Sequence, residues 1–488
     1  MVTPRRLNRG MLSALCALLG SPLAALAQAP DEDWRTLETE HFRVTFAAEM
    51  EDLARRAGDR AERAYANLSA TLIDPPGGKI DVLVTDHADF SNGFADAVPY
   101  NQVTVFARPP MEGFNISHFD DWMELVITHE LTHLFHLDHS GWLGSAVRKV
   151  FGRGSAAWPM FPGYAVPRWV TEGLATYYES ALTESGRVRG SFHDMILRTA
   201  ALEGRLERID QVSGDSPDWP AGDRVYVYGS AFFDHLTDRY GQELTGEFVD
   251  AVANQLIPYR LDSGARDAFG VGFSEAFDLW VTEMTATYTA LADSLARHAP
   301  ITEPERLTTG GRRAFYAQLA PSGERLAYVR SNGRSDVQLR VAAPDGSESR
   351  KLTRTNNLSN FTWLPDGTIV AAELEFTDPY RLRSDLVHID VDGHERWLTR
   401  GARLDQPSAS PDGGRVVAVQ DGEGTNRLVV VDVRTGAVEP LHDFVANQHW
   451  AYPRWSPDGR WIAASLWSPG AFYDLVLLRT DGAVAHRI

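Results

Sequence analysis

The C-terminal part of the chain repeats itself at a nearly constant interval. Turns of the form Pro-Asp-Gly or Pro-Ser-Gly recur at residues 321–323, 365–367, 411–413 and 457–459, which are 44, 46 and 46 positions apart. Each turn is followed by a short apolar run, and Asp-Gly turns separate further runs in most repeats. A period of this length with several short strands is typical of β-propellers, where one repeat forms one blade. Residues 301–488 are therefore predicted to form all-β propeller repeats, with about four blades.

These repeats resemble those of TolB-type proteins, whose propellers have about six blades. The last residues, 486–488, stand where an outer strand continues into a next blade in the earlier repeats. We therefore expect the chain to be a fragment of a longer protein, or a second chain to close the ring, because an open propeller leaves a strand edge unpaired. The resemblance implies a fold and a candidate surface for a protein partner, but no chemistry.

A second feature points to a metal site. The sequence His129-Glu130-Leu131-Thr132-His133 lies in an apolar stretch, residues 121–140, that contains no Gly or Pro and therefore favours a helix. Residues four apart share one face of a helix, so His129 and His133 can bind one ion, usually Zn²⁺. Glu130 would lie beside the metal and accept a proton from its water. Because such motifs also arise by chance, a third ligand is needed to support a catalytic site.

A second helical segment, after residue 167, contains a candidate for the third ligand. It contains Trp169, Glu172, Gly173 and Glu179 in the pattern Trp-x-x-Glu-Gly-x-Ala-x-Tyr-x-Glu. The two motifs together resemble the gluzincin metallopeptidases, especially the group of zinc aminopeptidases and leukotriene A4 hydrolase. The resemblance implies an α+β metallopeptidase domain, one Zn²⁺ per chain, and Glu172 as the third ligand. Glu179 and Asp138 are candidates for a carboxylate that orients a ligand histidine, whereas His136 is expected to be a surface or supporting residue.

The spacing differs from that of the aminopeptidases. Glu172 follows His133 by 172 − 133 = 39 positions, so residues 141–166 are expected to be an insertion. This segment is apolar without a clear period and contains several Gly and Pro residues. We expect either a packed loop or a wall of the substrate cleft, and we favour least a surface that contacts lipid.

A tyrosine and a strand complete the resemblance. Residues 225–229 resemble the Tyr-x-x-Gly helix start of the same group. The resemblance implies that Tyr226 donates a hydrogen bond to the oxyanion of the tetrahedral intermediate. The alternative is that Tyr226 and Tyr228 are ordinary half-buried tyrosines. The family also has an edge strand before the zinc helix, here predicted at residues 101–107. The amine-binding Glu of the aminopeptidases has no counterpart in residues 97–102, which favours an endopeptidase.

The N-terminus and the charge indicate where the protein acts. Residues 1–27 combine three arginines, an apolar run and a small-residue cleavage site at 25–27, which is typical of a secretory signal peptide. No other run approaches the roughly 18 apolar residues of a membrane span. Cys16, the single cysteine, lies in this segment. Without it the chain has 47 − 3 = 44 basic and 66 acidic residues, and this net charge of −22 argues against nucleic acid as a partner.

The sequence thus predicts a multidomain, exported protein of the periplasm or cell envelope. Residues 28–298 form the zinc metallopeptidase domain, with a β-rich part over 28–120 and a helical part with the zinc site over 121–298, and the propeller repeats follow. The predicted function is zinc-dependent hydrolysis of peptide or protein substrates, with Glu130 as the general base. The alternative is a periplasmic interaction scaffold with an inactive or structural zinc site. Glu130 favours the enzyme, because a structural site does not need it.

Overall fold

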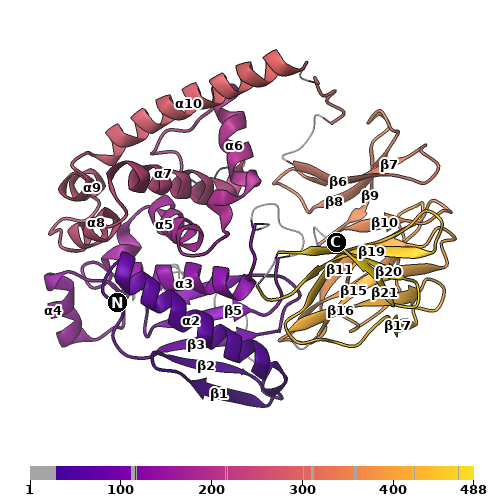
Figure 1. Cartoon of the computed structure of the whole chain (residues 1–488), viewed down its shortest axis with the longest axis horizontal. Coiled ribbons are helices and arrows are strands. Elements are labelled where there is room, and N and C mark those ends of the chain that lie inside the picture. The colour runs from indigo at the N-terminus through magenta and orange to yellow at the C-terminus, as the bar shows by residue number, and fades with distance from the viewer. Residues whose placement is uncertain are drawn as a thin grey trace, which may run out of the picture.

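The computed structural model describes residues 29–488 except 111–115, 117, 215, 217, 301, 309–312, 357–359, 423 and 471. The predicted signal peptide, residues 1–27, lies outside the described residues. Figure 1 shows a part with one sheet and many helices beside a part that consists of β-sheets alone, so the protein is multidomain. None of the helices among the described residues combines the length and apolar character needed to cross a bilayer.

The first part is built on a five-stranded sheet with the order β1-β2-β3-β5-β4. Its strands are β1 (Trp34–Glu38), β2 (Phe42–Ala47), β3 (Ile80–Thr85), β4 (Gly93–Asp96) and β5 (Gln102–Phe106). The three central strands run parallel, and β1 and β4 pair antiparallel at the two edges. Central strands of a parallel sheet are buried on both faces.

The edge strand is not the one that we predicted. The segment predicted at residues 101–107 forms β5, which lies inside the sheet between β3 and β4. The edge position belongs to β4, only four residues long, which pairs with β5 from Gly93 opposite Val105 to Asp96 opposite Gln102. So short a strand with a Gly and an Asp has no readable alternation, since both residues are disfavoured in strands. Its pairing is decided by the neighbouring strand.

Two helices cover one face of this sheet. Helix α2 (Glu51–Thr71) packs on β2, and helix α3 (Trp122–Asp138) packs on β4 and β5. Every residue of α3 except Glu124 is buried, because α2 and α5 also enclose it. A helix enclosed on all sides has no polar stripe. This explains the uniformly apolar stretch around the His-Glu-x-x-His motif.

The remaining helices lie mostly above this layer in Figure 1, except α4, which lies beside it at the left. They are α4 (Trp142–Phe151), α5 (Arg168–Ala181), α6 (Ser191–Leu202), α7 (Arg224–Tyr240), α8 (Leu244–Ala253), α9 (Leu261–Phe269) and α10 (Phe273–His298). Short 3₁₀ turns are η2 (Ala48–Met50), η3 (Pro162–Ala165), η4 (Arg187–Arg189) and η5 (Ala221–Asp223). The insertion at 141–166, predicted as a loop, therefore contains one regular helix.

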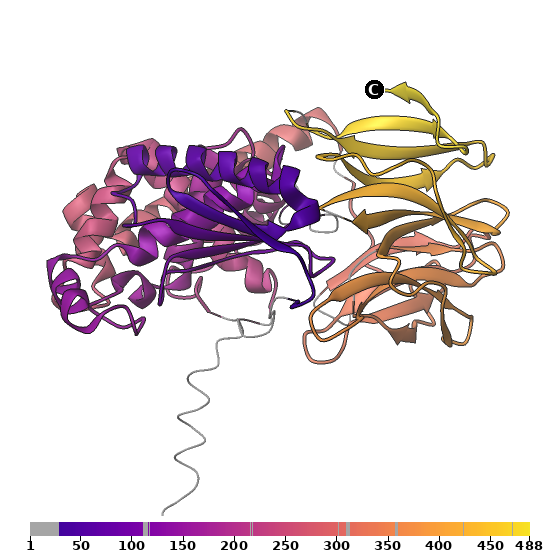
Figure 2. The same cartoon turned by 90° about the horizontal axis from the view of Figure 1, so that it is seen from below.

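The repeats form four sheets of four antiparallel strands, which follow one another in Figure 2. The first two sheets comprise β6 (Arg313–Leu319), β7 (Leu326–Ser331), β8 (Gln338–Ala342), β9 (Arg350–Arg354), β10 (Phe361–Trp363), β11 (Ile369–Phe376), β12 (Leu382–Ile389) and β13 (Glu395–Trp397). The others comprise β14 (Leu404–Ala409), β15 (Arg415–Gly422), β16 (Thr425–Asp432), β17 (Val438–Pro440), β18 (His449–Trp455), β19 (Trp461–Trp467), β20 (Asp474–Arg479) and β21 (Val484–Arg487). Each repeated turn joins the first and second strands of its sheet.

A largely buried cluster of charges joins the two parts. It comprises four carboxyl groups and three guanidinium groups, those of Asp86, Asp89, Asp405, Asp421, Arg108, Arg383 and Arg403. Asp86 and Asp89 lie in the connection from β3 to β4, and Ala88 in the same connection pairs with Leu382 of the propeller. The propeller therefore holds the loop that leads into edge strand β4.

Candidate active site

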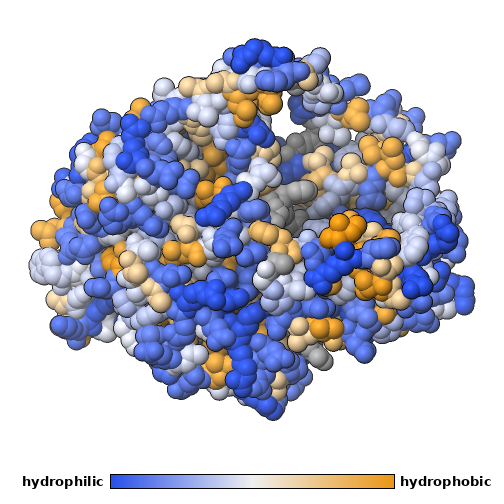
Figure 3. All heavy atoms as spheres, in the orientation of Figure 1, coloured by the Kyte–Doolittle hydropathy of each residue, from blue (hydrophilic) through white to orange (hydrophobic). Residues whose placement is uncertain are grey.

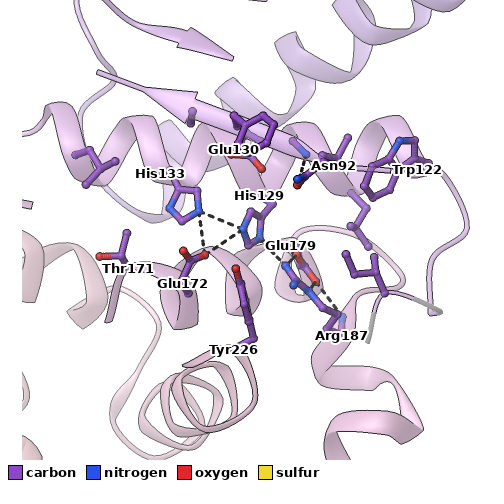
Figure 4. A pocket seen from close by; sticks show the side chains of 17 residues that line it. Asn92, Trp122, His129, Glu130, His133, Thr171, Glu172, Glu179, Arg187 and Tyr226 are labelled. Carbon is purple, nitrogen blue, oxygen red and sulfur yellow. Dashed lines mark hydrogen bonds and ion pairs between the residues drawn. The ribbon is translucent and has the colours of Figure 1, made fainter. Parts of the chain in front are cut away.

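Helix α3 presents the first three residues of the site. Asp121 caps its N-terminus, because the side chain accepts hydrogen bonds from the backbone N–H groups of Met123 and Glu124. One turn separates His129 from His133, and both imidazoles point to the same side of the helix (Figure 4). Their Nε2 atoms are 3.1 Å apart. The structure thus brings the two predicted ligands together.

Helix α5 brings Glu172 to these histidines. Its Oε2 atom lies 3.4 Å from His133 Nε2 and 3.8 Å from His129 Nε2. Ligand atoms about 2.0–2.2 Å from a tetrahedral Zn²⁺ lie about 3.3–3.6 Å from one another, close to the three observed separations. Two imidazole nitrogens and a carboxylate oxygen are also the donor set that suits Zn²⁺. The residues therefore fit this ion.

A buried ion pair supports His129 from behind. Glu179, two turns after Glu172, accepts a hydrogen bond of 2.8 Å at Oε2 from His129 Nδ1. Arg187 in η4 donates two hydrogen bonds to the same carboxylate. Its Nε lies 2.8 Å from Oε1 and its Nη2 lies 2.7 Å from Oε2. This bond places the proton on Nδ1 and leaves the Nε2 lone pair for a metal. Glu179 is thus the supporting carboxylate, one of two predicted candidates.

The charges of this group follow from its contacts. Burial favours neutral Glu179, but the charge and hydrogen bonds of Arg187 outweigh burial and lower the pKa of Glu179 to about 2. Burial opposes a charged His129, yet the hydrogen bonds with Glu172 and Glu179 raise its pKa to about 9. At neutral pH the site therefore favours a positive charge at His129 Nε2, either a second proton or a cation that replaces this proton. The sequence carried no signal for Arg187, because its role depends only on where the chain turns after α5.

Glu130 lies against the edge strand. A Cβ atom on Gly93 would lie 2.6 Å from Glu130 Oε1 and 2.6 Å from Val126 Cγ2, so only glycine lets the strand pass this close. Burial raises the pKa of Glu130. The carboxyl group thus lies between the histidines and the backbone of β4, a position from which it can reach a water or a peptide beside the cluster.

Tyr226 reaches the cluster from α7, which crosses α5 at unusually short range. Gly173 and Gly229 face each other there, and a Cβ atom on Gly229 would lie 2.8 Å from Gly173 Cα. The Tyr226 ring lies under the Arg187 guanidinium, whose Cζ is 4.8 Å from the ring centroid. Burial, with the Glu172 charge, raises the pKa of Tyr226 to about 12, so its hydroxyl keeps the proton at neutral pH. Tyr228 is buried away from the cluster, where its hydroxyl accepts a bond from the Glu207 N–H.

These groups line one cavity. Its polar lining residues are Asn92, Thr171, His129, Glu130, His133, Glu172, Glu179, Arg187 and Tyr226 (Figure 4). The other lining residues are Gly93 and the apolar Phe94, Ala95, Ile116, Trp122, Leu125, Val126 and Leu137. The cavity therefore offers an apolar surface beside the candidate metal ligands.

Several other predicted features do not reach this cavity. Asp138, the other candidate support, instead binds Arg148 and Arg153 at 3.0 and 2.6 Å. His136 is buried, and burial together with nearby His133 lowers its pKa to about 3, so it is neutral and outside the ligand cluster. Residues 141–166 contribute nothing to the cavity lining, so the cleft-wall interpretation of the insertion is wrong.

Because β4 is the edge strand, the search for an amine-binding acid must include its residues. We expected no acid on the strand that lines the cleft, but β4 ends in Asp96. Gly93, Phe94 and Ala95 of β4 line the cavity, and Asp96 at the end of the strand does not. The expectation that the strand at the cleft carries no acid was therefore wrong, although among the described residues no acid of β4 lines the cavity.

Comparison with known proteins gives partial matches. No protein-family model matches the chain. The chain is 26% identical over 164 residues to the uncharacterized peptidase YuxL of Bacillus subtilis (strain 168). The aligned region covers 32% of this chain and 22% of that protein. The chain thus spans about a fifth of the length of this curated relative.

Solved structures resemble the chain over a similar share. A TolB-type protein from Agrobacterium tumefaciens has a TM-score of 0.34 and 22% identity, covering 39% of this chain and 72% of that one. TolB from Acinetobacter baumannii has a TM-score of 0.33 and 16% identity, with 38% and 45% covered. A puromycin-hydrolyzing peptidase from Mycobacterium tuberculosis has a TM-score of 0.29 and 19% identity, with 38% and 30% covered. The resemblance to the gluzincins stays a prediction from the two motifs.

Proposed function

We propose that the protein is an exported zinc metallopeptidase that hydrolyses peptide bonds. The observation that carries the proposal is the convergence of His129 Nε2, His133 Nε2 and Glu172 Oε2 within 4.8 Å of one another in a cavity that also contains Glu130 and Tyr226. Three such ligands leave one position open, as catalytic rather than structural zinc sites do. Bound there, Zn²⁺ would acidify a water molecule and polarise the scissile carbonyl.

The chain's own residues supply the other parts of the reaction. Glu130 accepts a proton from the attacking water at a carboxylate oxygen and passes it to the leaving amine. Tyr226, protonated at neutral pH, donates a hydrogen bond to the oxygen on which negative charge develops. Arg187 and Glu179 take no part in proton transfer and keep His129 in one orientation.

The substrate is proposed to bind along the edge of the sheet. Strand β4 pairs with β5 on one side only, so its other edge can accept an extended peptide by strand addition. The apolar side chains that line the cavity would receive a substrate side chain. Because Asp96 does not line the cavity, the site has no strand carboxylate for a free amine, and cleavage within a chain is favoured.

The test separates the base from the ligands. A mixed peptide library is incubated with the purified protein, new termini are mapped, and zinc per chain is measured by mass spectrometry. Glu130→Gln should keep about one zinc and lose activity by about 10²–10⁴-fold, whereas Glu172→Ala should lose the zinc. Glu124→Gln is the matched control on the same helix, since Glu124 does not line the cavity. Turnover at the wild-type rate in Glu130→Gln would refute the mechanism.

A further inference from the structure

The insertion at residues 141–166 carries an exposed apolar surface. Among the described residues, eight large apolar side chains are more than 60% exposed. Six of them belong to two segments, α4 and the turn after α8: Trp142 65%, Val150 74%, Phe151 75%, Leu256 68%, Ile257 63% and Tyr259 81%. The other two are Phe376 and Ile488. We name the six side chains the apolar patch.

The two segments lie side by side. The backbone N–H of Trp142 donates a 3.2 Å hydrogen bond to Asn254 Oδ1, and His139 Nε2 lies 3.0 Å from Asp250 Oδ1. Residues 158–167 and 252–261 also line one common cavity. Figure 1 places α4 and α8 at the end of the molecule away from the propeller, so this end is not covered by the other domain. The start of α4 with Trp142 therefore lies beside the turn after α8, and Val150 and Phe151 lie at the other end of the same helix.

Helix α4 buries little of its apolar surface, since only Gly144 is buried and Leu143 and Val147 are half-buried. Trp142, Lys149 and Val150 are all exposed and occupy positions on one helix face, while Gly144 on the opposite side packs against the Pro159 backbone. Surface helices of soluble proteins normally turn the apolar face inward. On the face seen in Figure 3, apolar residues lie scattered among hydrophilic ones, as is ordinary for soluble proteins. Large apolar side chains that a helix leaves exposed mark an interaction surface.

The charge around the patch indicates which partner it fits. The chain has 66 acidic residues among 488, yet none falls in residues 139–171 or 251–261. These segments contain Arg148, Lys149, Arg153, Arg168 and Arg260, and Lys149 is one of only three lysines in the chain. Arg148 and Arg153 are paired with Asp138, whereas Lys149 and Arg260 are exposed. In a strongly acidic protein these two segments thus carry basic residues and no acid, which makes them complementary to negative charge. The acidic neighbours are Asp138, which pairs with the two arginines, and Asp250, which lies beside His139.

From these observations we propose that the apolar patch docks the protein on an anionic membrane surface. Interfacial helices place aromatic and aliphatic side chains at the headgroup level and keep basic residues among the headgroups. Trp142, Phe151 and Tyr259 are residue types that favour this depth, and Lys149 and Arg260 face the lipid phosphates. A protein partner fits less well, because lysine is depleted in the cores of protein interfaces and side chains this exposed project outward rather than line a groove.

Vesicle sedimentation tests the proposal with the whole protein. Vesicles of phosphatidylethanolamine and phosphatidylglycerol should bind it, vesicles of phosphatidylcholine alone should bind it far less, and added salt should release it. The double variant Trp142→Ser and Phe151→Ser should bind about tenfold or more weakly, because two apolar anchors are lost. Lys149→Glu should bind about tenfold more weakly. Unchanged melting temperatures would show that the variants fold.

Matched variants on the propeller serve as controls. Phe376→Ser removes a side chain that is 62% exposed, and Lys351→Glu reverses an exposed lysine on β9, so both should leave vesicle binding unchanged. Equal losses in these controls, equal binding to both vesicle types, or no binding at all would overturn the proposal. Self-association in vesicle-free solution that the double variant abolishes would instead identify the patch as an interface between copies of the chain.

Discussion

The crossing of α5 and α7 makes a specific prediction for Gly229→Ala. The added methyl group would lie 2.3 Å from the Trp169 carbonyl oxygen, whereas ordinary van der Waals contact begins at 3.4 Å. The helices must therefore separate by about 1 Å, since 3.4 − 2.3 = 1.1. Helix α7 carries Tyr226 and α5 carries Glu172, so this separation moves the phenol away from the ligand cluster.

The expected effects can be estimated from that displacement. A misplacement of about 1 Å in a catalytic constellation costs about 10²-fold in rate, and overpacking costs about 1–3 kcal/mol of stability. Zinc content should stay near one per chain, because α7 contributes none of the three ligands. The kcat on a peptide identified in the library assay, the zinc content, and unfolding in urea measure the three quantities separately.

A second glycine provides the control for this experiment. Gly222 lies in η5, immediately before α7, and a Cβ atom there would have no neighbour within 4 Å. Gly222→Ala should therefore keep the wild-type kcat and stability. If Gly229→Ala also retained both, the close helix crossing would not position Tyr226. If Gly222→Ala were equally damaged, the loss could not be assigned to the crossing.

Three further predictions concern single residues. Tyr226→Phe should lower kcat by about 10²–10³-fold with little change in KM, and the same change at Tyr228 should not, which steady-state kinetics would decide. Glu179→Gln should weaken zinc affinity by about 10–100-fold in a chelator competition, because His129 loses the carboxylate behind it; unaltered affinity would exclude that role. Asp421 is the least well paired of four carboxyl groups that share three guanidinium groups, and burial raises its pKa to about 7. The folded state then holds a proton that the unfolded state releases near pH 4, so the free energy of unfolding should fall as pH rises from about 4 to 7. Asp421→Asn should flatten this decrease in urea titrations at several pH values, and an identical slope in both proteins would show that Asp421 is not the group that titrates.

Features that depend on neighbours along the chain could be predicted from the sequence. The spacing of His129 and His133 requires only a helix, and the apolar stretch predicted to be helical contains α3, Trp122–Asp138. The repeated turns likewise predicted the four sheets of β6 to β21, because each sheet forms from consecutive strands. Such features follow from local periodicity and turn chemistry, which the order of residues contains.

Features that depend on distant segments were decided by the tertiary structure alone. Strand β4 is an edge strand because β5 pairs with it, and its own four residues show no strand pattern. Arg187 supports His129 only because the turn after α5 carries it back to Glu179, whereas Asp138, equally plausible in the sequence, is taken by Arg148 and Arg153. The exposure of Trp142 and Val150 on α4 could not be predicted either, because periodicity tells which residues share a face but not where that face points. Direction in space is set by packing between segments far apart in the chain, and the order of residues does not contain it.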